Sequence, residues 1–254
     1  MRYALISDIH ANLPALDAVL ADIQALELSN ATYHLGDLVG YAPWPNEVVD
    51  RIRESGIAGV AGNYDSTVAT DYKHCGCRYE DARQEALAHL SYEWTRAHIS
   101  PSAKAWLGTL PFRLDLRPRG GHLSGPTVTL IHGNQRLNTV YVTDDRSDEF
   151  LTTMGTALGS RSGDVVAFGH THKPWHRVVN GVHFVNTGSV GRPKDGDWRA
   201  GYVIVDVGGD AVTVDFRRLE YDVERAAKAI IGSTLPDDFA DYLRTGGKPI
   251  ATSV

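Results

Sequence analysis

Apolar residues along this chain fall into short uninterrupted runs and into longer stretches with helical spacing. The run "RYALISD" (residues 2–8) has no helical period, which indicates a buried strand. The next stretch, residues 11–28, repeats its apolar residues on one helical face. Asn12 can cap this helix, and Pro14 suits its first turn. The first thirty residues therefore predict a strand followed by an amphipathic helix.

The same alternation continues over the next thirty residues. We expect a strand at residues 31–37, a helix at 46–56 and a third strand at 57–63. Asn46 is placed to cap that helix, and Gly56 lies just past its end. The order βαβαβ predicts a largely parallel sheet covered by helices.

The rest of the chain has an irregular and helical middle part and a second half that is rich in strands. Residues 64–77 are polar and show no period, so we expect an irregular segment there, followed by helices at 79–98 and 101–110. The second half contains a helix at about 144–158 and a hairpin turn at 180–181, an Asn-Gly pair between two strand-like runs. Strands are expected within residues 127–133, 165–172, 176–188, 201–207 and 211–220.

Composition narrows the class of protein. The 254 residues are 43% hydrophobic and 22% charged, which is typical of a globular protein, and we expect one domain spanning 1–254 with a polar helical tail at about 221–254. The formal net charge of −6 argues against nucleic acid as a partner. Oligomeric state is left open.

Two further patterns bear on location. No apolar run approaches the ~18 residues of a membrane span, and the N-terminus shows no secretory pattern. Cys75 and Cys77, in "HCGCR", form neither a disulfide framework nor the usual zinc-ribbon pair. Together these observations predict a protein of the reducing cytoplasm with no membrane partner.

Residues able to bind metal ions recur where the predicted strands stop. In α/β sheets, the crevice outside the carboxyl ends of the strands is where sites form. Each such residue alone is explained as a loop or turn residue, but their shared position relative to the sheet favours one common site. They are Asp8, His10, Asp37, Asn63, His132, His170 and His172.

The residue types suit a particular group of metals. Aspartate, histidine and asparagine offer mixed nitrogen and oxygen ligands, which suit Mn²⁺, Fe, Zn²⁺ or Ni²⁺. Asp8 and His10 alternate in what we take to be extended backbone, so both side chains point the same way toward one ion. His170 and His172 have the same spacing. Asp37 can bridge two ions through its two oxygens.

Five motifs in order, "SDIH", "GDLVG", "GNYD", "IHG" and "GHTH", resemble those of the calcineurin-like metallophosphoesterases. The pattern extends from residue 6 to about residue 191, and "NTGSVGRPKDGD" resembles the small single-domain bacterial branch. The resemblance implies an α/β fold, a four-layer α/β-β/α sandwich with two facing mixed β-sheets and flanking helices. It also implies a hydrolase of phosphodiester or phosphomonoester bonds that uses two divalent ions (Mn, Fe, Ni or Zn) and a hydroxide bridging them.

The resemblance assigns residues to the two ions. The first would be held by Asp8, His10, Asp37 and His172, and the second by Asp37, Asn63, His132 and His170. Through these contacts Asp37, Asn63 and His10 would take part in catalysis.

One position departs from the family pattern. Many members have "GNH" where this chain has Tyr64, so the histidine that stabilises the transition state or protonates the leaving group is missing. Tyr64 and His74 are candidates for contacting substrate. Asn12 is a third, either as a plain helix cap or as a phosphate contact at the helix N-terminus. Arg192 either meets phosphate or forms a surface ion pair.

Alternatives remain at this point. The expected partner is a small phosphorylated substrate, and nucleotides are among the candidates. A non-catalytic scaffold that binds a partner protein is the alternative, although such derivatives typically lose ligands and every ligand position is kept here. A metallo-β-lactamase-type hydrolase would need a His-x-His-x-Asp-His cluster, which "GHTHKP" lacks.

Overall fold

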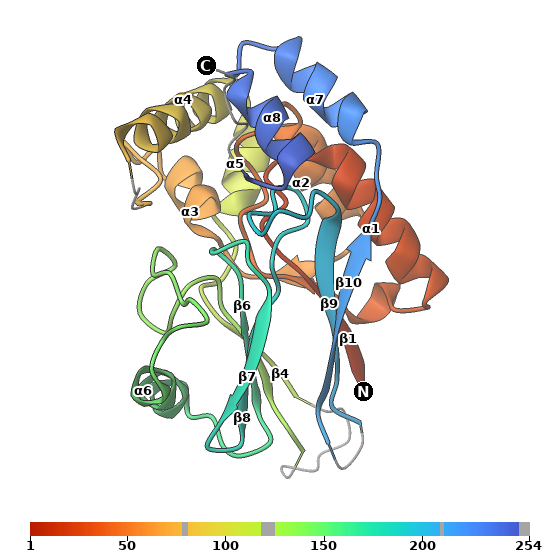
Figure 1. Cartoon of the computed structure of the whole chain (residues 1–254), viewed down its shortest axis with the longest axis vertical. Coiled ribbons are helices and arrows are strands. Elements are labelled where there is room, and N and C mark those ends of the chain that lie inside the picture. The colour runs from red at the N-terminus through yellow and green to blue at the C-terminus, as the bar shows by residue number, and fades with distance from the viewer. Residues whose placement is uncertain (78–80, 118–124, 209–210, 249–254) are drawn as a thin grey trace.

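The strands form two five-stranded sheets that lie face to face (Figure 1). The computed structural model describes residues 1–77, 81–117, 125–208 and 211–248. The first sheet has the order β10-β9-β1-β2-β3. Its strands β1, β2 and β3 are parallel to one another, and β9 is antiparallel to both of its neighbours, β1 and β10. Its strands are β1 (Arg2–Ile6), β2 (Thr32–His34), β3 (Ala58–Gly59), β9 (Ala200–Asp206) and β10 (Thr213–Leu219).

The second sheet is also mixed and has the order β4-β5-β6-β8-β7. Its inner strands β5, β6 and β8 are parallel, and the edge strands β4 and β7 are antiparallel to their neighbours. The strands are β4 (Leu114–Leu116), β5 (Val128–Leu130), β6 (Val165–Phe168), β7 (Trp175–Val179) and β8 (Val182–Asn186). Asn180 and Gly181 join β7 to β8 with φ of 52° and 76°, so the hairpin predicted from this pair is confirmed.

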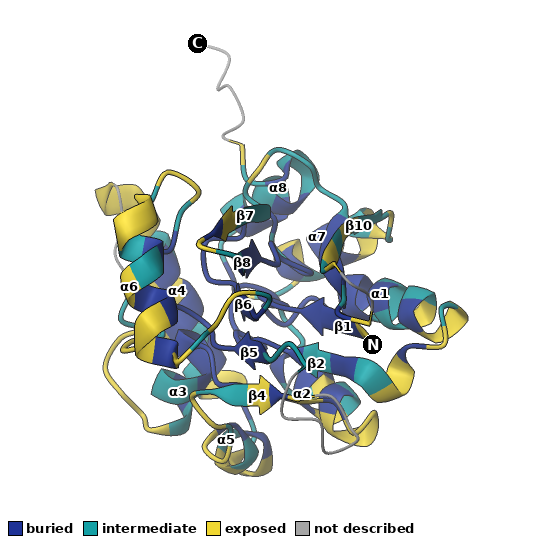
Figure 2. Cartoon of the chain, turned by 90° about the horizontal axis from the view of Figure 1, so that it is seen from below, coloured by how far each residue is buried: buried dark blue, intermediate teal, exposed yellow. Residues whose placement is uncertain are grey.

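Three apolar cores separate the layers. Leu5, Val165 and Val203 belong to the core between the two sheets. A second core lies between the first sheet and its helices, and a third lies between the second sheet and α6 (Asp148–Leu158). Figure 2 shows the buried strands between α6 on one side and α1 (Leu13–Ala25) on the other. The predicted four-layer sandwich is therefore confirmed.

The other helices gather at one end of the molecule. Figure 1 places α7 and α8 at the same end as α2, α4 and α5. α8 buries Phe239, Ala240 and Leu243 in the same core as α1, so the tail expected to be polar has an apolar face. No helix within the described ranges is long and apolar enough to cross a membrane. The helices at this end are α2 (Pro45–Glu54), α3 (Asn63–Ala69), α4 (Ala82–His98), α5 (Pro101–Leu107), α7 (Val223–Ile231) and α8 (Asp238–Thr245). The 3-10 helix η1 (Ser29–Ala31) instead precedes β2, at the opposite end of the parallel strands.

The predicted start of the second long helix was wrong. α2 begins at Pro45 with Trp44 at its N-cap, so Asn46 lies inside the helix. The Asn46 side chain instead donates to the His98 carbonyl at 2.9 Å and accepts from the Ser100 N–H at 2.7 Å. A tertiary contact with the α4–α5 junction thus outweighs the local capping preference. Gly56 follows the end of α2 with φ of 63°, as expected.

The segment expected to be irregular contains a helix. α3 occupies Asn63–Ala69, and the strand expected at 57–63 shrinks to the two residues of β3. The cause is Asp65, whose carboxylate accepts from the N–H groups of Gly62 and Leu38 at 2.9 Å each. Elsewhere the boundaries shift by a few residues. α4 begins at Ala82, and the part of its predicted range at 79–80 lies outside the described residues.

Candidate metal centre

The seven predicted ligand residues lie together at one edge of the sandwich, beyond the carboxyl ends of parallel strands in both sheets. Two groups bring possible ligand atoms within 4.8 Å of one another. Each group takes residues from both sheets, because those that follow β1 and β2 meet those that follow β5 and β6. The first group is Asp8, His10 and His172, and the second is Asp37, His132 and His170.

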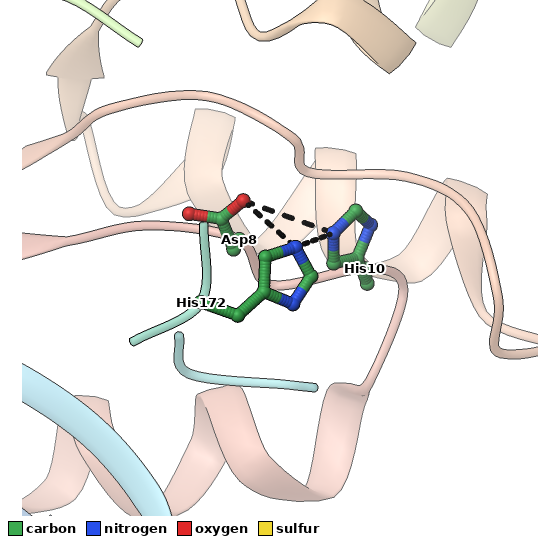
Figure 3. Close-up of side chains that lie close together, drawn as sticks. All are labelled: Asp8, His10 and His172. Carbon is green, nitrogen blue, oxygen red and sulfur yellow. Dashed lines mark hydrogen bonds and ion pairs between the residues drawn. The ribbon is translucent and has the colours of Figure 1, made fainter. Parts of the chain in front are cut away.

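The first group presents three ligand atoms to one small volume (Figure 3). His10 Nε2 lies 3.1 Å from His172 Nε2, and His172 Nε2 lies 3.2 Å from Asp8 Oδ1. Asp8 Oδ2 accepts from the His170 N–H at 3.0 Å, whereas Oδ1 is buried without a hydrogen-bond partner in the described part of the chain. A buried carboxylate oxygen without a donor is costly, and a bound cation would satisfy it.

Hydrogen bonds behind the imidazoles fix their orientation. The Nδ1–H of His10 donates to the Val39 carbonyl at 3.0 Å, and that of His172 donates to the Arg192 carbonyl at 2.6 Å. A carbonyl only accepts, so Nδ1 carries the proton and Nε2 keeps its lone pair toward the centre. His132 also donates its Nδ1–H to a carbonyl, the backbone oxygen of residue 35 at 2.7 Å. Such second bonds are typical of histidines that bind metals.

The second group includes the predicted amide ligand. Asn63 Oδ1 lies 3.1 Å from His132 Nε2. The Asn63 Nδ2 donates to the Cys75 carbonyl and to Cys77 Sγ, both at 3.1 Å, which turns the amide oxygen toward His132. The role of the cysteines seen here is therefore to orient Asn63, and neither belongs to the two ligand groups.

His170 completes the second group. Its Nε2 is buried without a hydrogen-bond partner among the described residues, as Asp8 Oδ1 is in the first group. Tyr141 stacks on its ring with 4.1 Å between centroids and 29° between planes. This stacking and a hydrogen bond to the backbone of Thr139 hold the ring while its Nε2 faces the centre.

Asp37 lies between the two groups. Its Oδ2 is 3.5 Å from His132 Nε2 and 3.7 Å from His10 Nε2. Its Oδ1 accepts from the Tyr64 N–H at 2.9 Å. We expected both carboxylate oxygens to face ions, but a single oxygen faces both groups because the other is taken by the first turn of α3.

The backbone at these residues is left-handed. The φ values are 52° at Asp8, 49° at His10, 52° at Asp37, 66° at His170 and 60° at His172. The extended backbone predicted for the two Asp-x-His and His-x-His pairs was therefore wrong, and the side chains converge through a turn after each strand. Such conformations cost about 1–3 kcal/mol each and gather at functional sites.

Glycine allows two close backbone approaches at the site. A Cβ at Gly62 would lie 2.1 Å from Asp37 Oδ1, and one at Gly169 would lie 2.3 Å from Asp8 Oδ2. Neither position has room for a side chain. At both positions the missing side chain of glycine permits the close approach of the backbone.

Burial controls the charge of the imidazoles. Burial lowers the pKa of His10 and that of His170 to about 3, and it lowers the pKa of His172 together with the nearby Lys194. These three rings are neutral at pH 7, which is the form that binds metal. Burial also acts against the charged form of His132, but Asp37 outweighs it and raises the pKa of His132 to about 9.

A cavity of about 810 Å³ opens onto both groups. This volume is typical of a site for a small-molecule ligand. Apart from the candidate ligands, its walls contain three cationic side chains and several aromatic ones. The cations are Lys173, Arg192 and Lys194, and the aromatic residues are Tyr41, Tyr64, Tyr141, Phe239 and Tyr242.

The three candidates for substrate contact lie in different places. Tyr64 lines the cavity, but its hydroxyl donates to a backbone carbonyl of α4 at 3.4 Å. The Asn12 side chain accepts from the Ala15 N–H and donates to the Gly191 carbonyl, so it caps α1 as one interpretation proposed. His74 is exposed, and neither it nor Asn12 is among the residues that line the cavity. A substrate contact by either stays a prediction without a supporting contact.

Sequence reasoning missed much of the cavity wall. Phe239 and Tyr242 come from α8, nearly seventy residues past the last candidate ligand, and no local motif marks them. Lys194 has a weak signal, since it lies two residues after Arg192 in the segment with the family resemblance. Asp65, which holds the turns carrying Asp37 and Asn63, has a clearer one, because it belongs to the motif "GNYD".

Comparison with known proteins addresses the family directly. A model of the calcineurin-like phosphoesterase superfamily domain matches residues 1–210. The chain belongs to this superfamily. The resemblance in the motifs is thus confirmed over most of the chain, and the matched range ends before α7 and α8.

Relatives match over nearly the whole length. Uncharacterized protein MJ0912 of Methanocaldococcus jannaschii is 30% identical, over 96% of this chain and 97% of its own. The structure of a metallophosphoesterase from Sphaerobacter thermophilus is 27% identical, with a TM-score of 0.73 over 97% of this chain and 99% of that one. Hypothetical protein PH1004 from Pyrococcus horikoshii shares the fold, with 20% identity and a TM-score of 0.80 over 98% of this chain and 99% of that one.

Proposed function

We propose that this member of the superfamily is a hydrolase of phosphate esters that works with two divalent metal ions. The observation that carries the proposal is the position of Asp37 Oδ2, which faces His10 on one side and His132 on the other at the edge of the cavity. Two ions that share a carboxylate are a recurrent device for phosphoryl transfer and hydrolysis.

The donor set fits such ions. Two buried ligand atoms, Asp8 Oδ1 and His170 Nε2, have no hydrogen-bond partner among the residues described, and three other imidazoles turn Nε2 inward. Mixed nitrogen and oxygen donors suit Mn, Fe, Ni or Zn. Asp8, His10, Asp37 and His172 would hold the first ion, and Asp37, Asn63, His132 and His170 the second.

The residues themselves set the conditions for the chemistry. Bound divalent ions supply Lewis-acid polarisation of phosphoryl oxygens and lower the pKa of water. The chain holds both groups rigidly through buried backbone hydrogen bonds, and its imidazoles and the Asn63 amide add no negative charge beside an anionic ester. Arg192 and Lys194 line the same cavity and attract that ester.

The side chain at position 64 is not a strong acid that could protonate the leaving group. The Tyr64 hydroxyl is engaged with the α4 backbone, and a phenol is a weak acid with an unperturbed pKa near 10. Metal activation therefore provides most of the rate enhancement, and esters with good leaving groups react fastest. The cavity suits a small phosphorylated substrate, with nucleotides among the candidates. We further infer that residues 1–254 act as one unit, because α8 supplies part of the cavity wall.

An assay on metal-stripped protein tests the proposal. Hydrolysis of bis(p-nitrophenyl) phosphate and of p-nitrophenyl phosphate is measured before and after addition of Mn²⁺, Ni²⁺, Zn²⁺ or Mg²⁺, with bound metal counted by elemental analysis. We expect activity to vanish on stripping and to return with at least one ion at two per chain. Full metal occupancy without hydrolysis of either ester would contradict the proposal and favour the non-catalytic scaffold.

A further inference from the structure

The Arg192 guanidinium lies among aromatic rings inside the cavity. Its Cζ is 3.9 Å from the centroid of Tyr41, 5.2 Å from that of Tyr242 and 5.9 Å from that of Phe239. Cation–π contacts of this kind fix a guanidinium by its faces and leave the N–H groups at its edge available. Two of the three rings come from α8, so the last helix of the fold holds this cation in place.

The edge of that guanidinium has no partner among the described residues. Within the described ranges, the side chains of Arg192 and Lys194 make no hydrogen bond or ion pair, although both line the cavity. Arginines close by in sequence or space behave differently, since Arg199 pairs with Asp197 and Arg218 pairs with Asp195. Two cations on the wall of one cavity, neither in an ion pair within those ranges, are typical of an anion site.

The loop that carries both cations is fixed to the first ligand group. The Arg192 carbonyl accepts from His172 Nδ1 at 2.6 Å, and the Lys194 N–H donates to the His172 carbonyl at 3.3 Å. Tyr41 contacts both the guanidinium and the first group, because its centroid lies 5.0 Å from that of His10, with the rings at 90°, and 3.9 Å from Arg192 Cζ. Arg192 therefore lies beside the first group and shares Tyr41 as a neighbour with it.

Charge indicates what would bind there. Two divalent ions against the carboxylates of Asp8 and Asp37 leave a positive surplus that the reacting ester offsets. Arg192 and Lys194 add two positive charges that one ester group does not neutralise. A second phosphate group on the same substrate would do so, and a planar guanidinium binds phosphate through two parallel N–H bonds.

We propose that Arg192 and Lys194 form a second anion subsite, which selects substrates carrying a phosphate group in addition to the one that is hydrolysed. This inference rests on the proposed function for the position of the reacting group. Its own content is the recognition of the second phosphate, with Phe239 and Tyr242 of α8 holding Arg192 in place.

Two non-hydrolysable probes test the subsite in the metal-loaded protein. Methylphosphonate carries one phosphonate and methylenediphosphonate carries two, and calorimetry gives a Kd for each at a buffered free Mn²⁺ concentration. We expect the wild type to bind the second probe at least about tenfold more tightly, and Arg192→Met to remove most of that ratio, which corresponds to about 1.4 kcal/mol. Lys194→Met should reduce it by a smaller factor.

Comparison of ratios removes the effect of metal chelation by the probes, because wild type and variants are measured in the same buffer. Lys173→Met is the matched control, since it deletes an exposed positive charge from the same cavity wall, and its ratio should stay within about twofold of the wild type. Arg192→Lys, which keeps the charge but loses the planar fork, should fall between wild type and Arg192→Met.

The outcomes separate the subsite from the proposed function. Equal weakening of both probes by Arg192→Met would overturn the subsite, because Arg192 would then hold the reacting phosphoryl group. An unchanged ratio in Arg192→Met with a folded protein would overturn it as well. Failure of the proposed function is detected by a different measurement, the absence of metal-dependent ester hydrolysis by the wild type. The ratio of the two Kd values does not depend on that assay, so it tests the subsite separately.

Discussion

The two ligand groups share Asp37 but are held in place differently. In the first, His10 and His172 are fixed by backbone carbonyls of the turns and loops around the strand ends. In the second, Asn63 is oriented by the backbone and thiol of the Cys75–Cys77 segment, and His170 lies under Tyr141. The first ion is thus expected to depend on the sheet framework, and the second also on segments inserted after it.

Substitution of Asp37, which both groups share, should affect the two ions alike. Asp37→Asn keeps the size of the side chain but removes the charge between His10 and His132, so we expect loss of both ions. Activity toward bis(p-nitrophenyl) phosphate should fall by about 10³-fold or more, since two-ion catalysis supplies most of the rate. Elemental analysis measures the ions. Asp164→Asn is the control, because this buried carboxylate accepts from Thr127 and Arg161 at the other end of β6 and should keep both ions.

Substitutions of two histidines that lie two residues apart should each affect a different ion. His172→Ala removes a ligand of the first group, and His170→Ala removes one of the second. We expect each variant to lose mainly one ion and about 10²-fold or more in activity, within the range of metal contributions to catalysis. Metal titration followed by calorimetry should show one weakened site in each variant. The site that keeps its affinity should differ between the two variants. Loss of the same site in both variants would refute the division.

The cysteine segment should affect only the second ion. Cys77→Ala removes one of the two acceptors of the Asn63 amide, and we expect the second ion to bind about tenfold more weakly, as is typical when a group behind a ligand is lost. Cys77→Ser restores an acceptor and should bind both ions normally. Cys75→Ser is the matched control, because residue 75 contacts Asn63 through its backbone. A weakened first ion in Cys77→Ala would show that the groups are not independent.

Tyr64 should matter least. Its hydroxyl donates to Ala88 in α4, so Tyr64→Phe should lower kcat/KM for an aryl diester by less than about tenfold, below the usual contribution of a general acid. Tyr64→His should help an alkyl ester more than an aryl one, if the imidazole reaches the leaving oxygen. A loss of about a hundredfold or more in Tyr64→Phe with both ions bound would make Tyr64 a direct participant.

How far the sequence predicts the molecule depends on the range of the interactions. Helix α1, the hairpin turn at Asn180–Gly181 and the strands other than β4 follow from local patterns, and the ligand residues follow from motifs at strand ends. No strand was expected at Leu114–Leu116, where β4 lies. The start of α2 does not follow from the local pattern, because Asn46 forms hydrogen bonds with His98 and Ser100, about fifty residues away. Local preference is overridden wherever a distant partner satisfies the same polar group.

The site shows the same limit. The left-handed backbone at Asp8 and His172 cannot be read from a strand pattern, since residues other than glycine seldom adopt it. The α8 wall of the cavity cannot be read either, because Phe239 and Tyr242 look like ordinary apolar positions of an amphipathic helix. What the sequence carries well is the chemistry of the centre, and what it carries poorly is the shape around it.

The division of both ligand groups across the two sheets has a consequence for folding. His10 and His172 are 162 positions apart, so neither group exists until the sheets have docked. Such long-range contacts form late, after the cost of loop closure has been met. The ions therefore bind the native state and not the partly folded chain, and at a hundred times Kd each would stabilise it by about 2.7 kcal/mol. Metal uptake during refolding thus reports the moment at which the halves of the sandwich join.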